Sequence, residues 1–398
     1  MLGGWQFTSR RQTRFPREPV RFLLLAAALA PAQLASQSAA PASPPAAPLS
    51  SRLEAVVAAH HARGAFDGVV LVGRGDQIVY QRAIGMADRS WNVANTTETR
   101  FPWASITKQA TSALVLQLVG EGKLSLDAPL STYLPGLRAG HAGRVTLRHL
   151  LTNSSGLPNT EALPGYYIEA DSARQAMITQ ALAADLASEP GTKFVYNNLD
   201  FLLAGRVVEA VTGQPFEAAM RSRILDRAGL RATSMIRDDR VEPRLAQGYV
   251  GVTGADSARG FAPQPPTRIA SYGAAGALAG TAEDLFRFDR ALLGGRLFPA
   301  AMRDTMFRAE PALGFVALSV WRYPLVFGDR RVTLVERQGA IGGYANLNLI
   351  APEQDLVVIV LSNVDTADLF MTYGNRGLAY ELMREAQAEV SVPATAAR

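Results

Sequence analysis

Runs of β-forming residues stand near both ends of this chain, and a long stretch with the patterns of helices and loops separates them. The N-terminal pair of runs, 68–72 and 77–81, flanks a glycine-containing turn at 73–76, which is typical of a β-hairpin. The C-terminal runs and a closing helix are expected at 313–321, 331–338, 344–350, 356–361 and 367–386. Strands at both ends predict one sheet built from the two ends of the chain, with a helical lobe inserted between them.

The composition is that of a globular protein. Of the 398 residues, 48% are hydrophobic and 19% are charged, which argues against a disordered or collagen-like chain. Cysteine is absent, which excludes a disulfide scaffold, a cysteine-ligated metal site and a thiol nucleophile. The net charge is +5, but residues 1–36 hold five arginines against one glutamate, which leaves about +1 for the remainder. We therefore expect no nucleic-acid partner.

The first 36 residues have the order of a secretory signal peptide. An arginine-rich start precedes an apolar run over 22–29, and small residues follow at Ala30, Ala32 and Ala35. The apolar run is too short to span a bilayer. We therefore expect a periplasmic or secreted protein with no stable membrane span after signal removal. A disordered N-terminal arm is the alternative.

The rest of the chain divides by composition. Residues 37–51 are almost all Ala, Pro and Ser, and we expect them to form a solvated linker. The folded domain is expected over 52–390, and a C-terminal tail over 391–398. Within the domain, we expect an α/β lobe and a helical lobe, at about 52–100 together with 300–390 and at about 101–299.

Several common kinds of catalytic site can be excluded. The four histidines form no H-x-x-x-H or H-x-x-E-H pattern, so a zinc hydrolase lacks its ligand set. The chain has no Gly-x-Ser-x-Gly elbow, no phosphate-binding P-loop and no Gly-x-Gly-x-x-Gly motif. We expect no metal and no cofactor, and a structural role for His149.

Ser105 and Lys108 are the strongest candidates for chemistry. They lie three residues apart in a segment expected to be helical over 105–120, where positions i and i+3 share one face. Lysine, unlike arginine, can lose its proton when it is desolvated, and this chain has only three lysines. The pair therefore suggests a serine nucleophile beside a base. The alternative is that Ser105 caps the helix, although a cap favours an acidic residue or Gln where Lys108 stands.

Residues 101–109 resemble the active-site helix of the serine β-lactamase and penicillin-binding-protein superfamily, in particular its class C and esterase-like branch. Other segments resemble successive landmarks of that family in the expected order, namely 121–135, 145–158, 189–216 and 276–288. The agreement runs from about residue 53 to residue 383. The resemblance implies an α/β (α+β) fold of the β-lactamase/DD-peptidase type, in which helices flank an antiparallel sheet and a mostly helical lobe is inserted.

The resemblance also assigns Tyr196 and Asn198. The second catalytic element of the family is Tyr-x-Asn, and Tyr196-Asn197-Asn198 matches it. By this resemblance Tyr196 shares proton transfer and later activates water, while Asn198 hydrogen-bonds Lys108 and the substrate. A phenol needs a nearby ammonium to act as a base at neutral pH. Taken alone, the triplet is equally consistent with a turn and an Asn cap before a helix that begins near Leu199.

The third element of the family, Lys or His followed by Thr or Ser and then Gly, is altered here. The matching segment holds Arg337, Gln338 and Gly339. Arg337 keeps a charge that can bind a carboxylate and Gly339 keeps room for a substrate, but the hydroxyl is lost. The alternative is that Arg337 forms a surface ion pair with Glu336 or Glu353.

These features together imply an exported serine hydrolase that cleaves a small-molecule ester or amide through an acyl-enzyme on Ser105. The resemblance places the oxyanion hole at the backbone N–H groups of Ser105 and Ala340. Because the third element lacks its hydroxyl, we expect a carboxylesterase-like activity. The alternatives are a β-lactamase or D-stereospecific peptidase/DD-carboxypeptidase and, in another class, a weakly acylating or inactive penicillin-binding-type envelope receptor.

Overall fold

The computed structural model describes residues 47–134, 143–159, 179, 183–252, 260–367, 369 and 376–388. The expected signal peptide and the expected tail therefore lie outside the described residues. The first described helix, α1 (Leu49–Ala62), begins inside the segment expected to be a linker. Across the described part of the chain, no helix is long and apolar enough to cross a membrane.

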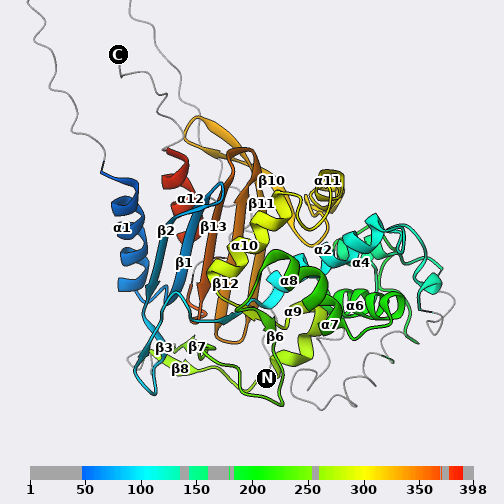
Figure 1. Ribbon diagram of the computed structural model, residues 1–398, viewed down its shortest axis with the longest axis horizontal. Coiled ribbons are helices and arrows are strands. Elements are labelled where there is room, and N and C mark those ends of the chain that lie inside the picture. The colour runs from blue at the N-terminus through cyan, green and yellow to red at the C-terminus, as the bar shows by residue number, and fades with distance from the viewer. Residues whose placement is uncertain are drawn as a thin grey trace, which may run out of the picture. The chain divides into compact units, whose positions relative to one another are not determined.

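A six-stranded antiparallel sheet joins the two ends of the chain. Its strand order is β10-β11-β12-β13-β1-β2, so the N-terminal hairpin lies beside the C-terminal strands (Figure 1). The strands are β1 (Gly68–Arg74), β2 (Gln77–Ile84), β10 (Trp321–Phe327), β11 (Arg330–Ile341), β12 (Tyr344–Ala351) and β13 (Leu356–Ser362). The prediction of one sheet built from both chain ends is confirmed.

Two of the expected C-terminal elements were placed wrongly. The run 313–321 is not a strand, because Gly314 and Phe315 have left-handed backbone (φ 73° and 59°) that extended pairing cannot accommodate. The strand begins only at its last residue, Trp321. The closing helix, α12 (Leu378–Ala388), begins after Gly377, whose φ is 90°; part of the earlier segment lies outside the described residues.

Alternation along the strands buries the two faces of the sheet in different hydrophobic cores. In β1, Val69 and Leu71 join one core, whereas Val70 and Val72 join the other. The helix α10 (Ala282–Leu293) packs on β1 and β13 from one side, and α1 and α12 pack together on the other side (Figure 1). Burial of both faces explains why β13 is apolar at nearly every position.

The middle of the chain forms helices and short strands around a buried helix, α2 (Thr107–Gly120). This helix contacts α6 (Asn198–Thr212), α9 (Gly273–Gly276) and α11 (Ala300–Met306). The other helical segments are η1 (Ala104–Ile106), η2 (Leu130–Thr132), α4 (Leu147–Leu151), α7 (Phe216–Met220), η4 (Arg221–Leu225), α8 (Asp226–Ala228), η6 (Ile269–Tyr272), η7 (Pro311–Leu313) and η8 (Pro352–Gln354). The short strands are β3 (Met86–Asp88), β4 (Val93–Ala94), β5 (Phe101–Pro102), β6 (Ser234–Met235), β7 (Tyr249–Gly251), β8 (Phe261–Pro263) and β9 (Leu278–Gly280).

Candidate active site

Ser105 follows a strained residue at the entry to the central helix. The preceding residue, Ala104, has a φ of 49°, a left-handed value that costs a residue with a Cβ about 1–2 kcal/mol. Ser105 then lies in the single turn η1, which leads directly into α2. No side chain caps either element, so the alternative that Ser105 is a helix cap is wrong.

The hydroxyl of Ser105 lies between an amine and a phenol. Its Oγ is 2.5 Å from Tyr196 Oη and 3.1 Å from Lys108 Nζ. Lys108 is fully buried, and it also donates to Asn198 Oδ1 (2.5 Å) and to the carbonyl of Ala275 (2.8 Å). The amine is therefore held at the serine by residues from α6 and α9 as well as by its own helix.

The Tyr-x-Asn triplet serves both as a helix start and as part of the site. The side chain of Asn197 caps α6 by accepting from the backbone N–H of Leu199 at 3.0 Å. The residues on either side of this cap, Tyr196 and Asn198, reach Ser105 and Lys108 respectively. The two interpretations of the triplet are thus both present in the structure.

The phenol of Tyr196 is surrounded by positive charge. Burial by itself raises the pKa of Tyr196, but the charges of Lys108 and Arg337 outweigh burial and leave that pKa below its ordinary value. The Lys108 Nζ lies 4.9 Å from the centre of the Tyr196 ring, and Arg337 donates to Tyr196 Oη at 3.0 Å. These cations favour the phenolate, which is the form that accepts a proton.

Arg337 is held by three oxygen atoms of the protein. It is only 3% exposed, and it donates to the carbonyls of Ser105 (2.8 Å) and Ser319 (3.0 Å) as well as to Tyr196 Oη. Burial lowers the pKa of Arg337, while the neighbouring Tyr196 raises it. The guanidinium therefore connects the turn η1 that carries Ser105, the phenol of Tyr196 and the loop before β10.

The two nearby glutamates have other partners. Glu336 is fully buried and accepts hydrogen bonds from three side chains, those of Tyr323, Tyr380 and Gln338. Glu353 forms an ion pair with Arg322. The alternative that Arg337 forms a surface ion pair with one of these glutamates is therefore wrong.

Gly339 lets strand β11 approach the turn η1. A Cβ at this position would lie 2.3 Å from the carbonyl oxygen of Trp103 and 3.2 Å from the backbone nitrogen of Ile106. The pairing of β10 with β11 ends at Glu336, so the following residues of β11 keep one edge free of β10. Ala340 lies on this part of the strand and lines the cavity described next.

A cavity of about 390 Å³ opens beside Ser105. Its lining residues are Ser105, Phe194, Tyr196, Trp321, Arg337, Gln338 and Ala340. The rings of Phe194 and Trp321 meet edge to face with their centroids 6.0 Å apart, which gives the cavity an aromatic wall. Sequence reasoning missed both aromatic residues, although Phe194 precedes the Tyr-x-Asn triplet by only two positions.

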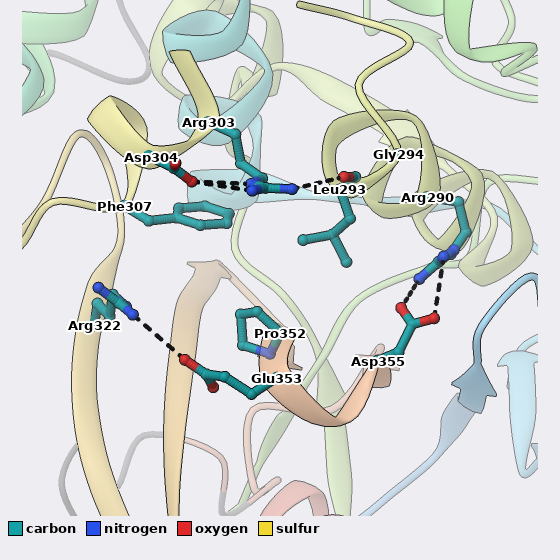
Figure 2. Close-up of a pocket in the computed structure, with 10 residues that line it drawn as sticks. All are labelled: Arg290, Leu293, Gly294, Arg303, Asp304, Phe307, Arg322, Pro352, Glu353 and Asp355. Atoms are coloured by element: carbon teal, nitrogen blue, oxygen red, sulfur yellow. Dashed lines mark hydrogen bonds and ion pairs between the residues drawn. The ribbon is translucent and has the colours of Figure 1, made fainter. Parts of the chain in front are cut away.

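A second cavity, of about 570 Å³, lies away from Ser105 and has a different character. Figure 2 shows that its three arginines each face a carboxylate: Arg290 with Asp355, Arg303 with Asp304, and Arg322 with Glu353. Its lining includes no hydroxyl or amine that could act as a nucleophile or base. The smaller cavity at Ser105 is therefore the better candidate for catalysis.

Three of the predicted site residues, Lys108, Asn198 and Gly339, lie outside the cavity lining. Asn198 contacts Lys108 behind the serine. His149 forms a capping box with Thr146 at the start of α4, which fits the structural role expected for it. Among the described residues, no group of three or more His, Cys, Asp or Glu side chains is placed to hold a metal ion.

Comparison of the sequence with known proteins identifies the family of this chain and several of its relatives. Residues 51–381 match the sequence profile of the family described as Beta-lactamase. Penicillin-binding protein 4 of Amycolatopsis lactamdurans is 28% identical over 357 residues, which cover 86% of this chain and 91% of that protein. Esterase EstB of Burkholderia gladioli is 31% identical over 306 residues, which cover 67% of this chain and 76% of that protein.

Solved structures share the fold. A penicillin-binding protein from Bacillus halodurans has a TM-score of 0.68 at 25% sequence identity. The matched region covers 85% of this chain and 98% of that protein's chain. D-amino acid amidase from Ochrobactrum anthropi has a TM-score of 0.73 at 24% identity, over 86% of this chain and 99% of its own. The predicted fold class is confirmed. With a profile match over most of its length and a Ser-Lys-Tyr cluster beside the cavity, this chain belongs to the β-lactamase family of serine hydrolases.

Proposed function

We propose that this protein hydrolyses a carboxylic ester through an acyl-enzyme on Ser105. The observation that carries the proposal is that Ser105 Oγ lies within hydrogen-bond distance of both Tyr196 Oη and Lys108 Nζ. A serine hydroxyl is a weak nucleophile until a neighbouring base takes its proton. The lowered pKa of Tyr196, next to the Lys108 amine, supports this pair as the base.

The reaction runs in two halves. In the first, Tyr196 accepts the Ser105 proton while Oγ bonds to the ester carbonyl carbon, and the backbone N–H groups of Ser105 and Ala340 receive the oxyanion. The bond to the leaving alcohol then breaks, and Tyr196 returns the proton to that alcohol. In the second half, water gives a proton to Tyr196 and attacks the acyl carbon, and Ser105 recovers its proton as the acid leaves.

The cavity supports a neutral ester as the substrate. Arg337, the residue expected to bind a substrate carboxylate, directs hydrogen bonds to three protein oxygens instead. The amide of Gln338 donates to the buried Glu336 at 2.6 Å. Phe194 and Trp321 offer an aromatic surface to an acyl chain. The relative EstB is described as an esterase, which agrees with this substrate class.

Activity and covalent labelling together test the proposal. We expect the protein to hydrolyse p-nitrophenyl butyrate with a higher kcat/KM than nitrocefin or D-alanine p-nitroanilide. Intact-mass spectrometry should show one added fluorophosphonate group in the wild type and none in Ser105→Ala, which serves as the control.

Other outcomes identify the alternatives. Faster turnover of nitrocefin than of the ester would mean that the protein is a β-lactamase, and faster turnover of the D-alanine amide would mean that it is a D-peptidase. The latter fits the D-aminopeptidase of Brucella anthropi, which is 32% identical over 53% of this chain and 40% of that protein. A wild type that is labelled by penicillin without turnover would indicate a receptor, and a wild type that reacts with none of these reagents would contradict the assignment of Ser105.

We further propose that the protein is exported, on the strength of the signal-like residues 1–36. N-terminal sequencing of the protein recovered from the periplasm or the medium should find roughly the first 30 to 40 residues missing, the usual length of such signals. Recovery of the chain with its Met1 intact from the cytosol would contradict export.

A further inference from the structure

Asp200 is a buried acid directly behind the candidate active site. It lies in the first turn of α6, two residues after Asn198, and it is fully buried. One carboxylate oxygen accepts from Ser155 Oγ at 2.5 Å, and the other accepts from Asn153 Nδ2 at 3.0 Å. The carboxylate therefore fastens the loop 153–158 to the start of α6.

The same loop is tied to the segment that carries Tyr196. The Asn153 amide donates to the carbonyl of Asn197 at 2.8 Å as well as to Asp200. The carbonyl of Asn153 accepts from the backbone N–H of Val195 at 2.8 Å, and the carbonyl of Ser154 accepts from that of Gly191 at 2.8 Å. Asn153 itself has a left-handed φ of 50°, and these bonds hold it in that conformation.

We propose that Asp200 is a positioning residue of this active site: its carboxylate fixes the loop 153–158 against the start of α6 and thereby holds Tyr196 and Asn198 at Ser105 and Lys108. This inference rests on the proposed function, because it takes Ser105, Lys108 and Tyr196 to be the residues that carry the reaction. The nucleophile and the amine come from η1 and α2, whereas the phenol comes from the segment before α6. Their distances therefore depend on how firmly that segment is anchored.

The charge state of Asp200 can change near neutral pH. Burial raises its pKa to about 7, although the hydrogen bonds from Ser155 and Asn153 and the charge of Lys108 act in the opposite direction. Two donors aimed at two oxygens fit the ionised carboxylate, because a protonated oxygen becomes a donor itself. Protonation should therefore loosen the loop as the pH falls through about 7.

The elements packed against α6 are α2, α4, α7 and α9. Their titratable side chains are Lys108 on α2, Arg148 and His149 on α4, and Glu217 on α7. Arg148 pairs with Asp127, His149 accepts from the backbone of Thr146, and Glu217 pairs with Arg237. Lys108 is thus the charged neighbour that acts on Asp200.

The test compares Asp200→Asn with a matched variant, Asp289→Asn, which neutralises another fully buried aspartate of raised pKa on α10. The readouts are kcat and KM for p-nitrophenyl butyrate and the rate of fluorophosphonate labelling, each from pH 6 to pH 8. For Asp200→Asn at pH 8 we expect about a tenfold lower kcat and labelling rate with KM changed by less than about twofold. Its loss of rate between pH 8 and pH 6 should be smaller than that of the wild type.

Two results would contradict the inference. One is an Asp200→Asn protein with the kcat and the pH profile of the wild type. The other is an Asp289→Asn protein that loses as much kcat and labelling rate as Asp200→Asn. If Asp200→Asn does not fold, Ser155→Ala removes one of the two bonds to the carboxylate and should lower kcat in the same direction; wild-type kcat in that variant would overturn the inference. If the wild type neither turns over ester nor accepts the label, the proposed function has failed. Amide hydrogen exchange then decides the role of Asp200, because Gly191 and Val195 should exchange faster in Asp200→Asn than in Asp289→Asn, and equal rates would overturn it.

Discussion

Two cations approach the hydroxyl of Tyr196, Lys108 from α2 and Arg337 from β11. A phenol in a buried site would ordinarily keep its proton, because the low dielectric disfavours the charged form. Here the two positive charges reverse that tendency. The two cations differ in what else they can do, since an amine can gain and lose a proton whereas a guanidinium stays charged. Substitutions at each should therefore have different effects.

Lys108→Arg should abolish ester turnover while leaving the protein folded. The guanidinium keeps the charge but cannot gain and lose a proton as part of the Lys108–Tyr196 base, and it is too large for the three acceptors that surround Lys108 Nζ. The measurement is kcat on p-nitrophenyl butyrate, with circular dichroism to check the fold. Lys123→Arg is the matched control, because Lys123 is half exposed and pairs with Glu121. A Lys108→Arg protein that keeps most of the wild-type kcat would show that Lys108 has no role in proton transfer.

Arg337→Gln should move the acidic limb of the pH profile to higher pH. Removal of this positive charge raises the pKa of Tyr196, so the phenolate needed for catalysis forms only at higher pH. The readout is kcat/KM for p-nitrophenyl butyrate between pH 5 and pH 9. Arg322→Gln, which removes an arginine paired with Glu353 instead, should leave the limb in place. An unchanged limb in Arg337→Gln would mean that Arg337 does not tune Tyr196.

At the level of elements, the site depends on the contact between β11 and η1. The strand lies against this turn at Gly339, and Arg337 crosses from the strand to the carbonyl of Ser105. The same strand is fixed from its other side by Glu336, which is bonded to Tyr323 of β10 and Tyr380 of α12. The position of the proposed oxyanion donors, the backbone N–H groups of Ser105 and Ala340, therefore depends on packing on both faces of β11.

Gly339→Ala should lower both stability and activity. The new Cβ would lie 2.3 Å from the Trp103 carbonyl oxygen, so β11 and η1 must separate. Overpacking of this kind costs about 1–3 kcal/mol of the free energy of unfolding. Urea denaturation and ester kinetics measure the two effects. Gly120→Ala, where the nearest atom to a new Cβ is 3.9 Å away, should be neutral or stabilising, and an equal response of the two variants would refute the steric argument.

Periodicity and turn chemistry are sufficient to predict most of the sheet, because β1 and β13 are short apolar runs bounded by turn residues. Periodicity and turn chemistry fail at 313–321. There the tertiary structure holds the apolar Phe315 and the small Ser319 in left-handed backbone. Nothing in the local sequence marks these two residues as exceptions, since non-glycine residues rarely adopt that conformation. The start of β10 is decided by packing instead.

The candidate site, like the sheet, can be predicted from the sequence only in part. Ser105 and Lys108 are close in sequence, so helical spacing predicts that they meet, and the resemblance to a known family adds Tyr196. Arg337 is assigned by the same resemblance, but its bonds to protein carbonyls depend on the turn η1 and on the loop before β10. Asp200 has no sequence signal at all, because an acid in the first turn of a helix is ordinary helix chemistry.

At the level of the whole molecule, a second buried acid affects stability. Asp289 of α10 is fully buried and accepts from Asn348 of β12 at 2.8 Å, and Asn348 also donates to Gln109 of α2 at 3.1 Å. This cluster links α10 and strand β12 of the sheet to the central helix α2. Burial raises the pKa of Asp289 to about 8, although the bond from Asn348 and the charge of Arg290 oppose this.

Asp289→Asn should stabilise the protein relative to the wild type increasingly as the pH rises. Because the folded pKa of Asp289 lies above its ordinary value, the stabilisation from the protonated acid is complete at low pH and is lost as the pH rises toward about 8. The amide cannot ionise, so it avoids this loss. Urea denaturation at pH 5, 7 and 9 measures the difference between the two free energies of unfolding. A difference that stays constant with pH would contradict the raised pKa.

The pairing of β1 with β13 runs from Gly68 opposite Ser362 to Arg74 opposite Leu356, so it joins the earliest strand of the sheet to the latest. During synthesis, the N-terminal hairpin has no neighbour on that side until β13 has been made. Contacts between such distant residues form slowly, since a very long loop must close first. An incomplete chain that stops before β13 would therefore expose the edge of an apolar strand, the kind of surface on which other chains can add. Chaperones that cover this edge should bind chains that lack β13 and release chains that include it.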